Sequence, residues 1–292
     1  MNTTAVDAFT SEGFNVLRGL FSSDDIAHLR QLRHDAVQDW CFANGTAAPP
    51  IVVGDLLERY PRTILKVVAD PDILGLAEAI MGPFVQLDSA VLHASPVRPR
   101  AERGGVVCWH RDRFGSFPVG AYTRPLTLVC FIYLQEMNDD TGPLRVVPRS
   151  HRDPVQIPES DVTTPHADEV LITTSPGDVV VIHNNLLHSG TANVSDAERQ
   201  FLGISYTLSC MGSRYDTFNG PNCRALLVTA RRMHDRRLMR LLGDDDQILA
   251  RQNTGFTTAS TQWSRWHDED QRFGSDSADI RRDVAKVWGW SA

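Results

Sequence analysis

Lysine is almost absent from this sequence. Of its 29 basic residues only two, Lys66 and Lys286, are lysine, and the formal net charge is −7. Nucleic acids and anionic membranes attract proteins with a net positive face, which a chain of this balance lacks. We therefore expect neither a nucleic-acid partner nor a membrane partner.

Long hydrophobic runs and paired cysteines are lacking as well. The longest nearly apolar run covers residues 126–134, whereas a membrane-spanning helix needs about 20 such residues. The first residues show no basic region followed by an apolar one, so we expect no signal peptide. The five cysteines are odd in number and form no C-x-x-C pair, which favours reduced cysteines and a cytoplasmic location over a disulfide framework.

What the sequence contains is three zones of different periodicity, and 42% hydrophobic residues overall. Residues 1–83 show helical spacing of apolar residues, most clearly in a helix from the capping residues 22–24 to about residue 44 and in one that Pro71 opens and Gly82 ends. Residues 211–292 return to helical spacing, with helices expected at 223–242 and 278–287. No linker separates the zones, so we expect one domain, 1–292.

The middle zone, residues 84–210, is rich in β-branched and aromatic residues punctuated by Gly, Pro, Asn and Asp. Many short strands without intervening helices are typical of an antiparallel sandwich or barrel. The expected fold is therefore a mostly β core with flanking α-helices. The expected strands cover residues 84–95, 106–110, 126–135, 144–147, 170–174, 179–183 and 200–208.

The residues that indicate chemistry begin with His110 and Asp112. On a strand, side chains two apart point to the same face, so one imidazole and one carboxylate converge. A third ligand is available late in the β zone, where either His183 or His188 follows a strand. Two His and one carboxylate leave three of six octahedral positions open, which is the arrangement of non-haem Fe(II) oxygenases.

Arg199 is a candidate for binding an anionic cosubstrate. It lies 11 residues after His188, on the next expected strand. The planar guanidinium binds a carboxylate in bidentate fashion, better than lysine does. One arginine would also neutralise the net negative charge left by Fe(II), Asp112 and a 2-oxo dicarboxylate, as burial requires.

Together these motifs resemble the phytanoyl-CoA dioxygenase (PhyH-like) family of Fe(II)/2-oxoglutarate-dependent oxygenases. The resemblance covers residues 9–210 and is most specific from 109 to 199. It rests on His110-x-Asp112, the segment from Asp140-Thr-Gly-Pro-Leu to Ser-His151, Gly177-Asp178, His188-Ser-Gly-x-x-Asn193 and Arg199. The fold that it implies is the double-stranded β-helix, a cupin-like jelly roll.

The resemblance also implies roles for individual residues. His110, Asp112 and His188, rather than His183, would ligate Fe(II) and form the catalytic centre, and Arg199 would bind the C5 carboxylate of 2-oxoglutarate. With O₂ as second cosubstrate, the enzyme would hydroxylate an unactivated C–H bond of a small molecule. The arginine-rich composition fits a bacterium of high GC content, where many such enzymes act in natural-product biosynthesis, that is, in secondary metabolism.

Two positions depart from the family pattern. Val107 stands where a polar residue often lies three before the first His, and Gly190 stands where a hydroxyl is common two after the distal His. Beyond the metal motif, a loop carries Arg113, Phe114 and Tyr122, which we expect to contact substrate because loops at a barrel mouth commonly do so.

Two alternatives remain open from the sequence. The first is a cupin-type metal-dependent dioxygenase or isomerase that does not use 2-oxoglutarate and does not need Arg199. The second is a non-catalytic jelly-roll binding module, in which the spacing from His188 to Arg199 would have no function.

Overall fold

The computed structural model describes residues 3–82, 84–112, 125–153, 155–209, 211 and 218–244. The helices are α1 (Thr3–Glu12), α2 (Ser23–Asn44), α3 (Leu56–Arg59), α4 (Pro61–Val68), α5 (Pro71–Met81), α6 (Pro221–Met233) and α7 (Arg236–Leu241), with short 3-10 helices at Arg100–Glu102 and Glu159–Asp161. The strands are β1 (Phe14–Leu17), β2 (Val52–Val53), β3 (Val85–Ser95), β4 (Thr127–Tyr133), β5 (Leu144–Val146), β6 (Val170–Ile172), β7 (Val179–His183), β8 (His188–Gly190) and β9 (Arg199–Leu208).

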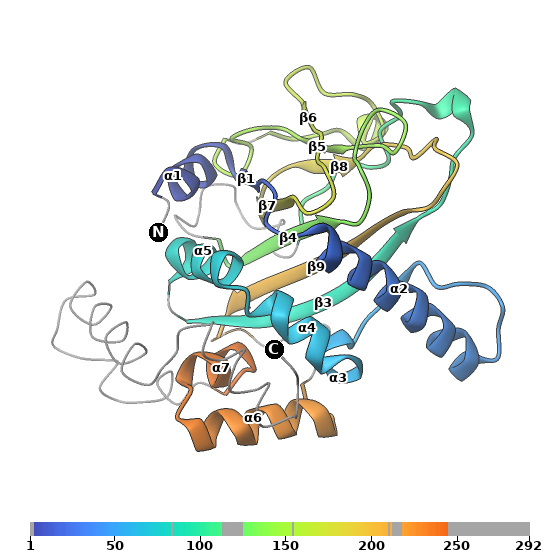
Figure 1. Ribbon diagram of the computed structural model, residues 1–292. Coiled ribbons are helices and arrows are strands. Elements are labelled where there is room, and N and C mark those ends of the chain that lie inside the picture. The colour runs from blue at the N-terminus through green and yellow to red at the C-terminus, as the bar shows by residue number, and fades with distance from the viewer. Residues whose placement is uncertain are drawn as a thin grey trace, which may run out of the picture. The chain divides into compact units, whose positions relative to one another are not determined.

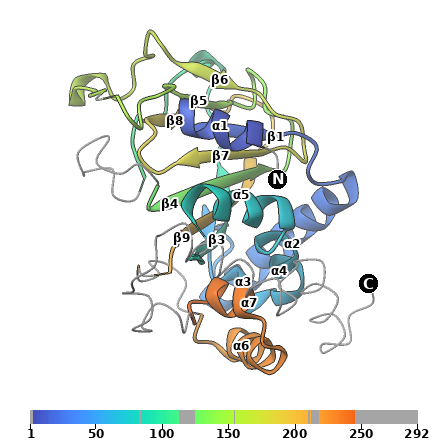
Figure 2. The same ribbon diagram turned by 90° about the vertical axis from the view of Figure 1, so that its left-hand side faces the viewer.

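These strands form two sheets. The larger has the order β1-β7-β4-β9-β3-β2 and the smaller has the order β6-β5-β8, and Figures 1 and 2 show β5, β6 and β8 grouped on one side of β7 and β4. A buried apolar cluster joins the two sheets, because it contains Val180 and Ile182 of β7 together with Leu144, Val146 and Ile172 of β5 and β6. Such a two-sheet β core agrees with the jelly roll expected from the sequence.

By its internal contacts the described chain divides into two compact units. One comprises the described residues up to Gly54 and those from Val91 to Ile204, and the other comprises the described residues from Asp55 to Ala90 and from Ser205 onward. Strands β3 and β9 run from one unit into the other. The expectation of a single domain over 1–292 stays a prediction.

Helices α3 to α7 belong to the second unit, where polar contacts fix their ends. The Glu58 carboxylate accepts the backbone N–H groups of Asn222 and Cys223 at 3.0 and 2.9 Å, at the start of α6. Burial opposes its ionisation, but these hydrogen bonds prevail and hold the pKa of Glu58 below its usual range. Arg237 of α7 forms an ion pair with Glu78 of α5 at 2.7 Å.

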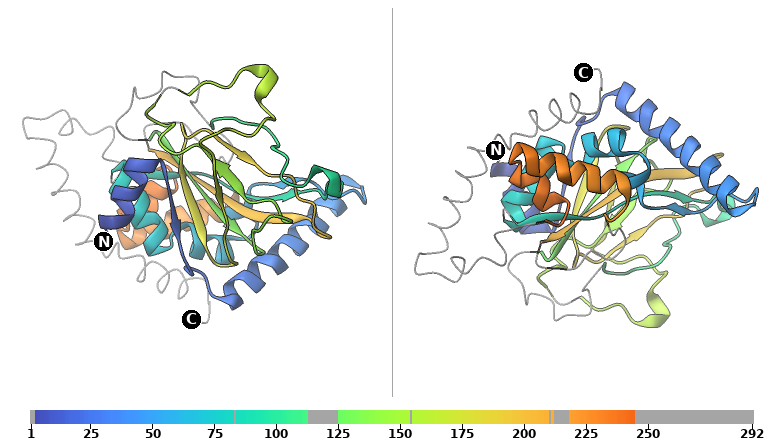
Figure 3. Two further views of the ribbon diagram at one scale, coloured as in Figure 1. Left: turned by 90° about the horizontal axis from the view of Figure 1, so that it is seen from above. Right: turned by 90° about the horizontal axis from the view of Figure 1, so that it is seen from below.

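Local sequence signals explain where the two best-predicted helices begin and end. Helix α2, a single long helix in Figure 3, begins with a capping box between Ser22 and Asp25 and ends at Gly45 in the left-handed conformation. Helix α5 has Pro71 in its first turn, the Asp70 carboxylate as its N-cap and Gly82 at its end. Both predicted helices are confirmed.

The expected helical zone 1–83 is wrong in one respect that matters for the core. Residues Phe14–Leu17 form β1, which pairs antiparallel with β7, from Phe14 opposite Ile182 to Leu17 opposite Val179. The segment is too short for its period to be recognised, and it becomes a strand because the edge of β7 offers backbone hydrogen bonds.

Two further expectations need correction. Residues 106–110 form no continuous strand, since bridges occur only at Val106 and His110, and the N–H of Cys108 between them binds the Ser189 hydroxyl at 2.9 Å instead of a backbone carbonyl. The expected helix 223–242 is two helices, because His234 adopts a left-handed conformation and the Asp235 carboxylate caps α7.

The helix expected at 278–287 lies outside the described residues. Within the described ranges, no helix is long and apolar enough to cross a membrane.

The turn before β7 holds the chain where it leaves β1. A Cβ atom on Gly177, whose φ is +98°, would lie 2.2 Å from the Phe21 carbonyl oxygen, so only glycine fits there. The buried Asp178 carboxylate accepts the N–H of Gly19 at 2.8 Å and of Ser175 at 3.0 Å, and pairs with Arg18 at 2.6 Å. Burial would raise its pKa, but these bonds outweigh burial and lower the pKa of Asp178.

We expect Asp178→Asn to lower the free energy of unfolding by about 1–3 kcal/mol at pH 7. The substitution replaces one acceptor oxygen of the buried carboxylate by an NH₂ group, which cannot accept a hydrogen bond. A carboxyl whose pKa is lowered by folding stabilises the protein above the unfolded pKa of about 3.9, and this contribution is lost as the pH falls through the folded pKa. Urea unfolding across this pH range should show the gap to wild type closing below pH 4. Asp196→Asn, on an exposed acid, is the control, and a gap that does not depend on pH would contradict the account.

Candidate metal centre

Three side chains converge at one point of the β core. One ligand atom each from His110, Asp112 and His188 lies within 4.8 Å of the others, and this is the one such metal-binding group within the described ranges. The Asp112 Oδ1 atom is 3.9 Å from His110 Nε2 and 3.7 Å from His188 Nε2. The structure thus brings together the three residues that the sequence singled out.

Backbone pairing produces this convergence. His110 and His188 each donate their N–H to the other's carbonyl, at 2.9 and 3.0 Å, which holds two residues directly opposite each other across an antiparallel bridge. The Asp112 N–H binds the carbonyl of Asn184 at 3.0 Å, in the turn that follows β7. Two segments far apart in sequence, residues 110–112 and 184–188, therefore fix the three side chains by backbone hydrogen bonds alone.

Hydrogen bonds also set which ring nitrogens are free. His110 Nδ1 lies 2.9 Å from the Cys108 carbonyl and His188 Nδ1 lies 2.9 Å from the Leu186 carbonyl. A carbonyl only accepts, so each Nδ1 carries the proton and each Nε2 presents a lone pair. Such outer hydrogen bonds to metal-ligating histidines orient the ring and fix its tautomer.

The donor set fits a divalent metal ion. The Asp112 Oδ2 atom is buried without a hydrogen-bond partner among the described residues, which is costly for a carboxylate unless a cation completes it. Two imidazole nitrogens and one carboxylate are the ligands of facial-triad iron sites. Burial lowers the pKa of His188, against the opposing pull of Asp112, so this ring favours its neutral, ligating form.

His183, the alternative third ligand, lies outside this cluster. Its Nδ1 accepts the N–H of Asn185 at 3.0 Å, and its ring lies 5.0 Å from that of His151 and 6.1 Å from that of Phe9. Burial and the neighbouring His151 lower the pKa of His183 to about 3. His183 is therefore a neutral residue that packs the N-terminal segment against β7.

Arg199 is a buried cation whose partners are all neutral. It donates Nη1 to the carbonyls of Thr191, at 2.7 Å, and Gly142, and donates Nη2 to the Ser95 hydroxyl at 3.1 Å. Its Nε is buried without a partner, and no carboxylate pairs with it among the described residues. Burial lowers the pKa of Arg199, yet guanidinium stays charged in proteins, so its charge is available to bind an anion.

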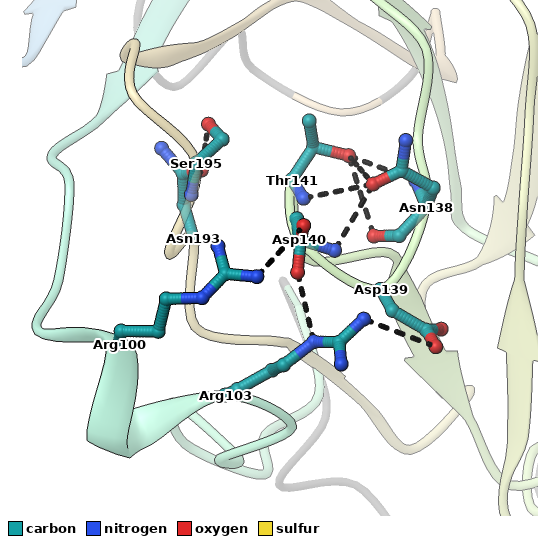
Figure 4. A network of polar contacts seen from close by, with 8 residues as sticks. All are labelled: Arg100, Arg103, Asn138, Asp139, Asp140, Thr141, Asn193 and Ser195. Carbon is teal, nitrogen blue, oxygen red and sulfur yellow. Dashed lines mark hydrogen bonds and ion pairs between the residues drawn. The ribbon is translucent and has the colours of Figure 1, made fainter.

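A polar network fixes the turn between β4 and β5 (Figure 4), and this turn provides the Gly142 carbonyl that binds Arg199. Asn138 and Thr141 bind each other across the turn, and Asp140 forms an ion pair with Arg103 at 2.8 Å. This places Gly142 so close to Thr191 that a Cβ on the glycine would lie 2.5 Å from the Thr191 carbonyl oxygen. Both carbonyls therefore reach one guanidinium.

Sequence reasoning missed Arg111, which lies between two candidate ligands. Its Nε binds the Asn185 carbonyl at 2.8 Å and its Nη2 binds the carbonyls of Val155 and Ser150 at 2.8 and 3.3 Å. It thereby connects the metal motif to the turn after β7. Arg111 lies between the two candidate ligands, so on an extended chain its side chain points to the opposite face, and this position could have predicted a supporting role.

The expected substrate residues Arg113, Phe114 and Tyr122 lie outside the described residues.

Known proteins share this architecture. Ectoine dioxygenase of Bordetella bronchiseptica is 24% identical over 251 residues, which cover 76% of this chain and 78% of that protein. The structure of EctD from S. alaskensis with bound Fe matches with a TM-score of 0.59 at 23% identity, over 74% of this chain and 80% of that one. The non-haem α-ketoglutarate-dependent epimerase SnoN from nogalamycin biosynthesis matches with a TM-score of 0.53 at 18% identity, over 71% and 80%.

These likenesses show the fold, and the expected double-stranded β-helix is confirmed. The family model described as phytanoyl-CoA dioxygenase (PhyH) matches residues 9–201, more than half of the sequence. The chain therefore belongs to the phytanoyl-CoA dioxygenase family of Fe(II)/2-oxoglutarate-dependent oxygenases.

Proposed function

We propose that this protein hydroxylates an unactivated C–H bond of a small molecule, with His110, Asp112 and His188 as the Fe(II) ligands and Arg199 as the anchor for 2-oxoglutarate. The observation that carries the proposal is the preorganised triad: both Nε2 lone pairs and the unpartnered Asp112 oxygen are left for an ion. Ectoine, the compound in the name of the dioxygenase relatives, is the first substrate to test.

Each residue has a defined task in this reaction. When bound, Fe(II) would supply the redox centre at which 2-oxoglutarate and O₂ become succinate and CO₂, with one oxygen atom going to the substrate. The Cys108 and Leu186 carbonyls keep the two imidazoles in the ligating tautomer. Arg199 orients the cosubstrate by its far carboxylate, through Nε and the remaining N–H of Nη2, which have no partner among the described residues.

The unpaired charge of Arg199 favours this function over a metal enzyme that does not use 2-oxoglutarate. A buried guanidinium with only neutral partners is poorly compensated, and an anionic ligand compensates it. A cupin-type dioxygenase or isomerase would not need this cation.

The nogalamycin-pathway neighbour, which by its name is an α-ketoglutarate-dependent enzyme, supports a role in natural-product biosynthesis.

Asp112→Ala should abolish Fe(II)-dependent succinate formation from 2-oxoglutarate, because only two neutral ligands remain. Succinate is measured in the presence of O₂ and Fe(II), with Asp196→Ala as a control on an exposed acid. Succinate formation at the wild-type rate in Asp112→Ala would exclude the triad.

His183 and His188 offer a matched pair of substitutions. We expect His188→Ala to lose stoichiometric Fe(II) binding in an anaerobic titration, whereas His183→Ala retains it and loses thermal stability. The reason is that only His188 joins the cluster, while His183 packs against Phe9 and His151. The opposite result would transfer the ligand role to His183.

Arg199→Met should raise the half-saturating concentration of 2-oxoglutarate by about 100-fold or more, because two charge-assisted hydrogen bonds of roughly 1.5–3 kcal/mol each are lost. The measurement is the visible charge-transfer band of the anaerobic Fe(II) protein during a 2-oxoglutarate titration. Arg152→Met, on an exposed arginine that contacts the Ser11 carbonyl, should change nothing. If the band forms at the same concentrations in Arg199→Met, the anchor is elsewhere.

A further inference from the structure

Gly190 leaves the Arg199 guanidinium without a hydroxyl neighbour from β8. An added Cβ atom at this position would lie 3.0 Å from Arg199 Nη2 and 3.6 Å from a methyl group of Val107. Both departures from the family pattern are therefore neighbours of each other and lie next to the arginine. Any hydroxyl that helps Arg199 to bind an anion must come from other strands.

Ser95 on β3 is one such hydroxyl. Its Oγ accepts an N–H from Arg199 Nη2 at 3.1 Å. The Ser95 O–H itself has no acceptor among the described residues. A hydroxyl that accepts from the cation can still donate its own hydrogen to an anion bound there.

Tyr133 at the end of β4 carries a second hydroxyl that can serve Arg199 in this way. The residue is only 3% exposed and its hydroxyl bonds to none of the described residues. The oxygen is not one of the fully enclosed polar atoms, so it can donate to a ligand, as a tyrosine O–H at a largely buried position usually does to some partner. Burial raises the pKa of Tyr133 and the nearby Arg199 cation opposes this rise. The phenol is thus protonated and available as a donor.

The sheet places these groups on one face. The Leu134 N–H binds the Gln200 carbonyl at 3.0 Å, and the Tyr133 ring lies 5.5 Å from that of Phe201. Phe201 is two residues beyond Arg199, so both point to the same side of β9. On the other flank, His93 stacks on Phe201 at 4.8 Å and Ser95, two residues later, reaches Arg199.

Aromatic rings connect this face with the metal centre. Phe131 lies 6.4 Å from the His188 ring and 5.5 Å from Phe201, measured between ring centroids. Phe131 and Phe201 are both only partly buried. They offer an apolar surface to the methylene groups of a ligand that extends from the triad toward Arg199.

We propose that Tyr133 and Ser95 donate hydrogen bonds to the far carboxylate of 2-oxoglutarate, beside Arg199, in place of the hydroxyl that Gly190 lacks. The inference rests on the proposed function and assigns two further binding residues to it. A carboxylate offers about four lone-pair sites. Arg199 has five N–H donors, three of which have protein partners, so its remaining two and the two hydroxyls make four donors.

The test removes single hydroxyl groups and compares two ligands. Tyr133→Phe, Ser95→Ala and wild type, each loaded with Fe(II) under anaerobic conditions, are titrated by calorimetry with 2-oxoglutarate and with 2-oxopentanoate. The second ligand has the same carbon chain without the far carboxylate. We expect each variant to bind 2-oxoglutarate about ten- to a hundredfold more weakly and to bind 2-oxopentanoate with wild-type affinity.

Two controls are matched in chemistry. Tyr206→Phe removes a buried hydroxyl that donates to the Val68 carbonyl at 2.7 Å, and Ser160→Ala removes an exposed hydroxyl next to Asp161. Both should leave the affinities for the two ligands unchanged. Unaltered 2-oxoglutarate affinity in Tyr133→Phe and Ser95→Ala, or equal losses for both ligands, would overturn the inference while the proposed function stands. If wild type itself does not prefer the dicarboxylate, the proposed function fails as well.

Discussion

The reciprocal backbone bridge between His110 and His188 is the contact on which the site depends. Two N–H···O=C bonds of 2.9 and 3.0 Å hold these residues opposite each other, although they are separated by 78 positions in the sequence. Each ring then uses Nδ1 to bind a nearby carbonyl. The imidazoles are thus oriented by the sheet, and Asp112 is brought in by Asn184. Backbone pairing in the fold therefore offsets the free energy needed to bring these polar side chains close together.

The second constraint is the buried charge of Arg199. Backbone carbonyls at Gly142 and Thr191 solvate part of the guanidinium, but dipoles alone compensate a buried cation poorly. The turn between β4 and β5 makes this arrangement rigid, because Asn138, Thr141 and the Asp140–Arg103 pair fix the carbonyl of Gly142. A preformed cation in fixed geometry binds a carboxylate with little reorganisation.

Much of the fold could be predicted because strong local signals agree with it. Ser22 and Asp25, Pro71 and Gly82 mark helix ends by their own side-chain chemistry. The predictions failed where structure is imposed from a distance. Phe14–Leu17 is a strand because β7 lies beside it, and Cys108 leaves the backbone ladder because a serine hydroxyl of β8 reaches its N–H. Neither partner can be found from neighbouring residues in the sequence.

The sequence by itself determined the candidate ligands, the cation and the family, because a motif of fixed residue types at fixed spacing carries that information locally. The tertiary structure decided which histidine joins the cluster, which ring nitrogens face into it and which hydroxyl binds Arg199. His183 and His188 are only five residues apart in the sequence. Only His188 pairs with His110, and this pairing places His188, and not His183, in the cluster. Tyr133 and Ser95 carry no motif; Ser95 binds the Arg199 guanidinium, and both residues belong to strands, β4 and β3, that flank β9 in the sheet.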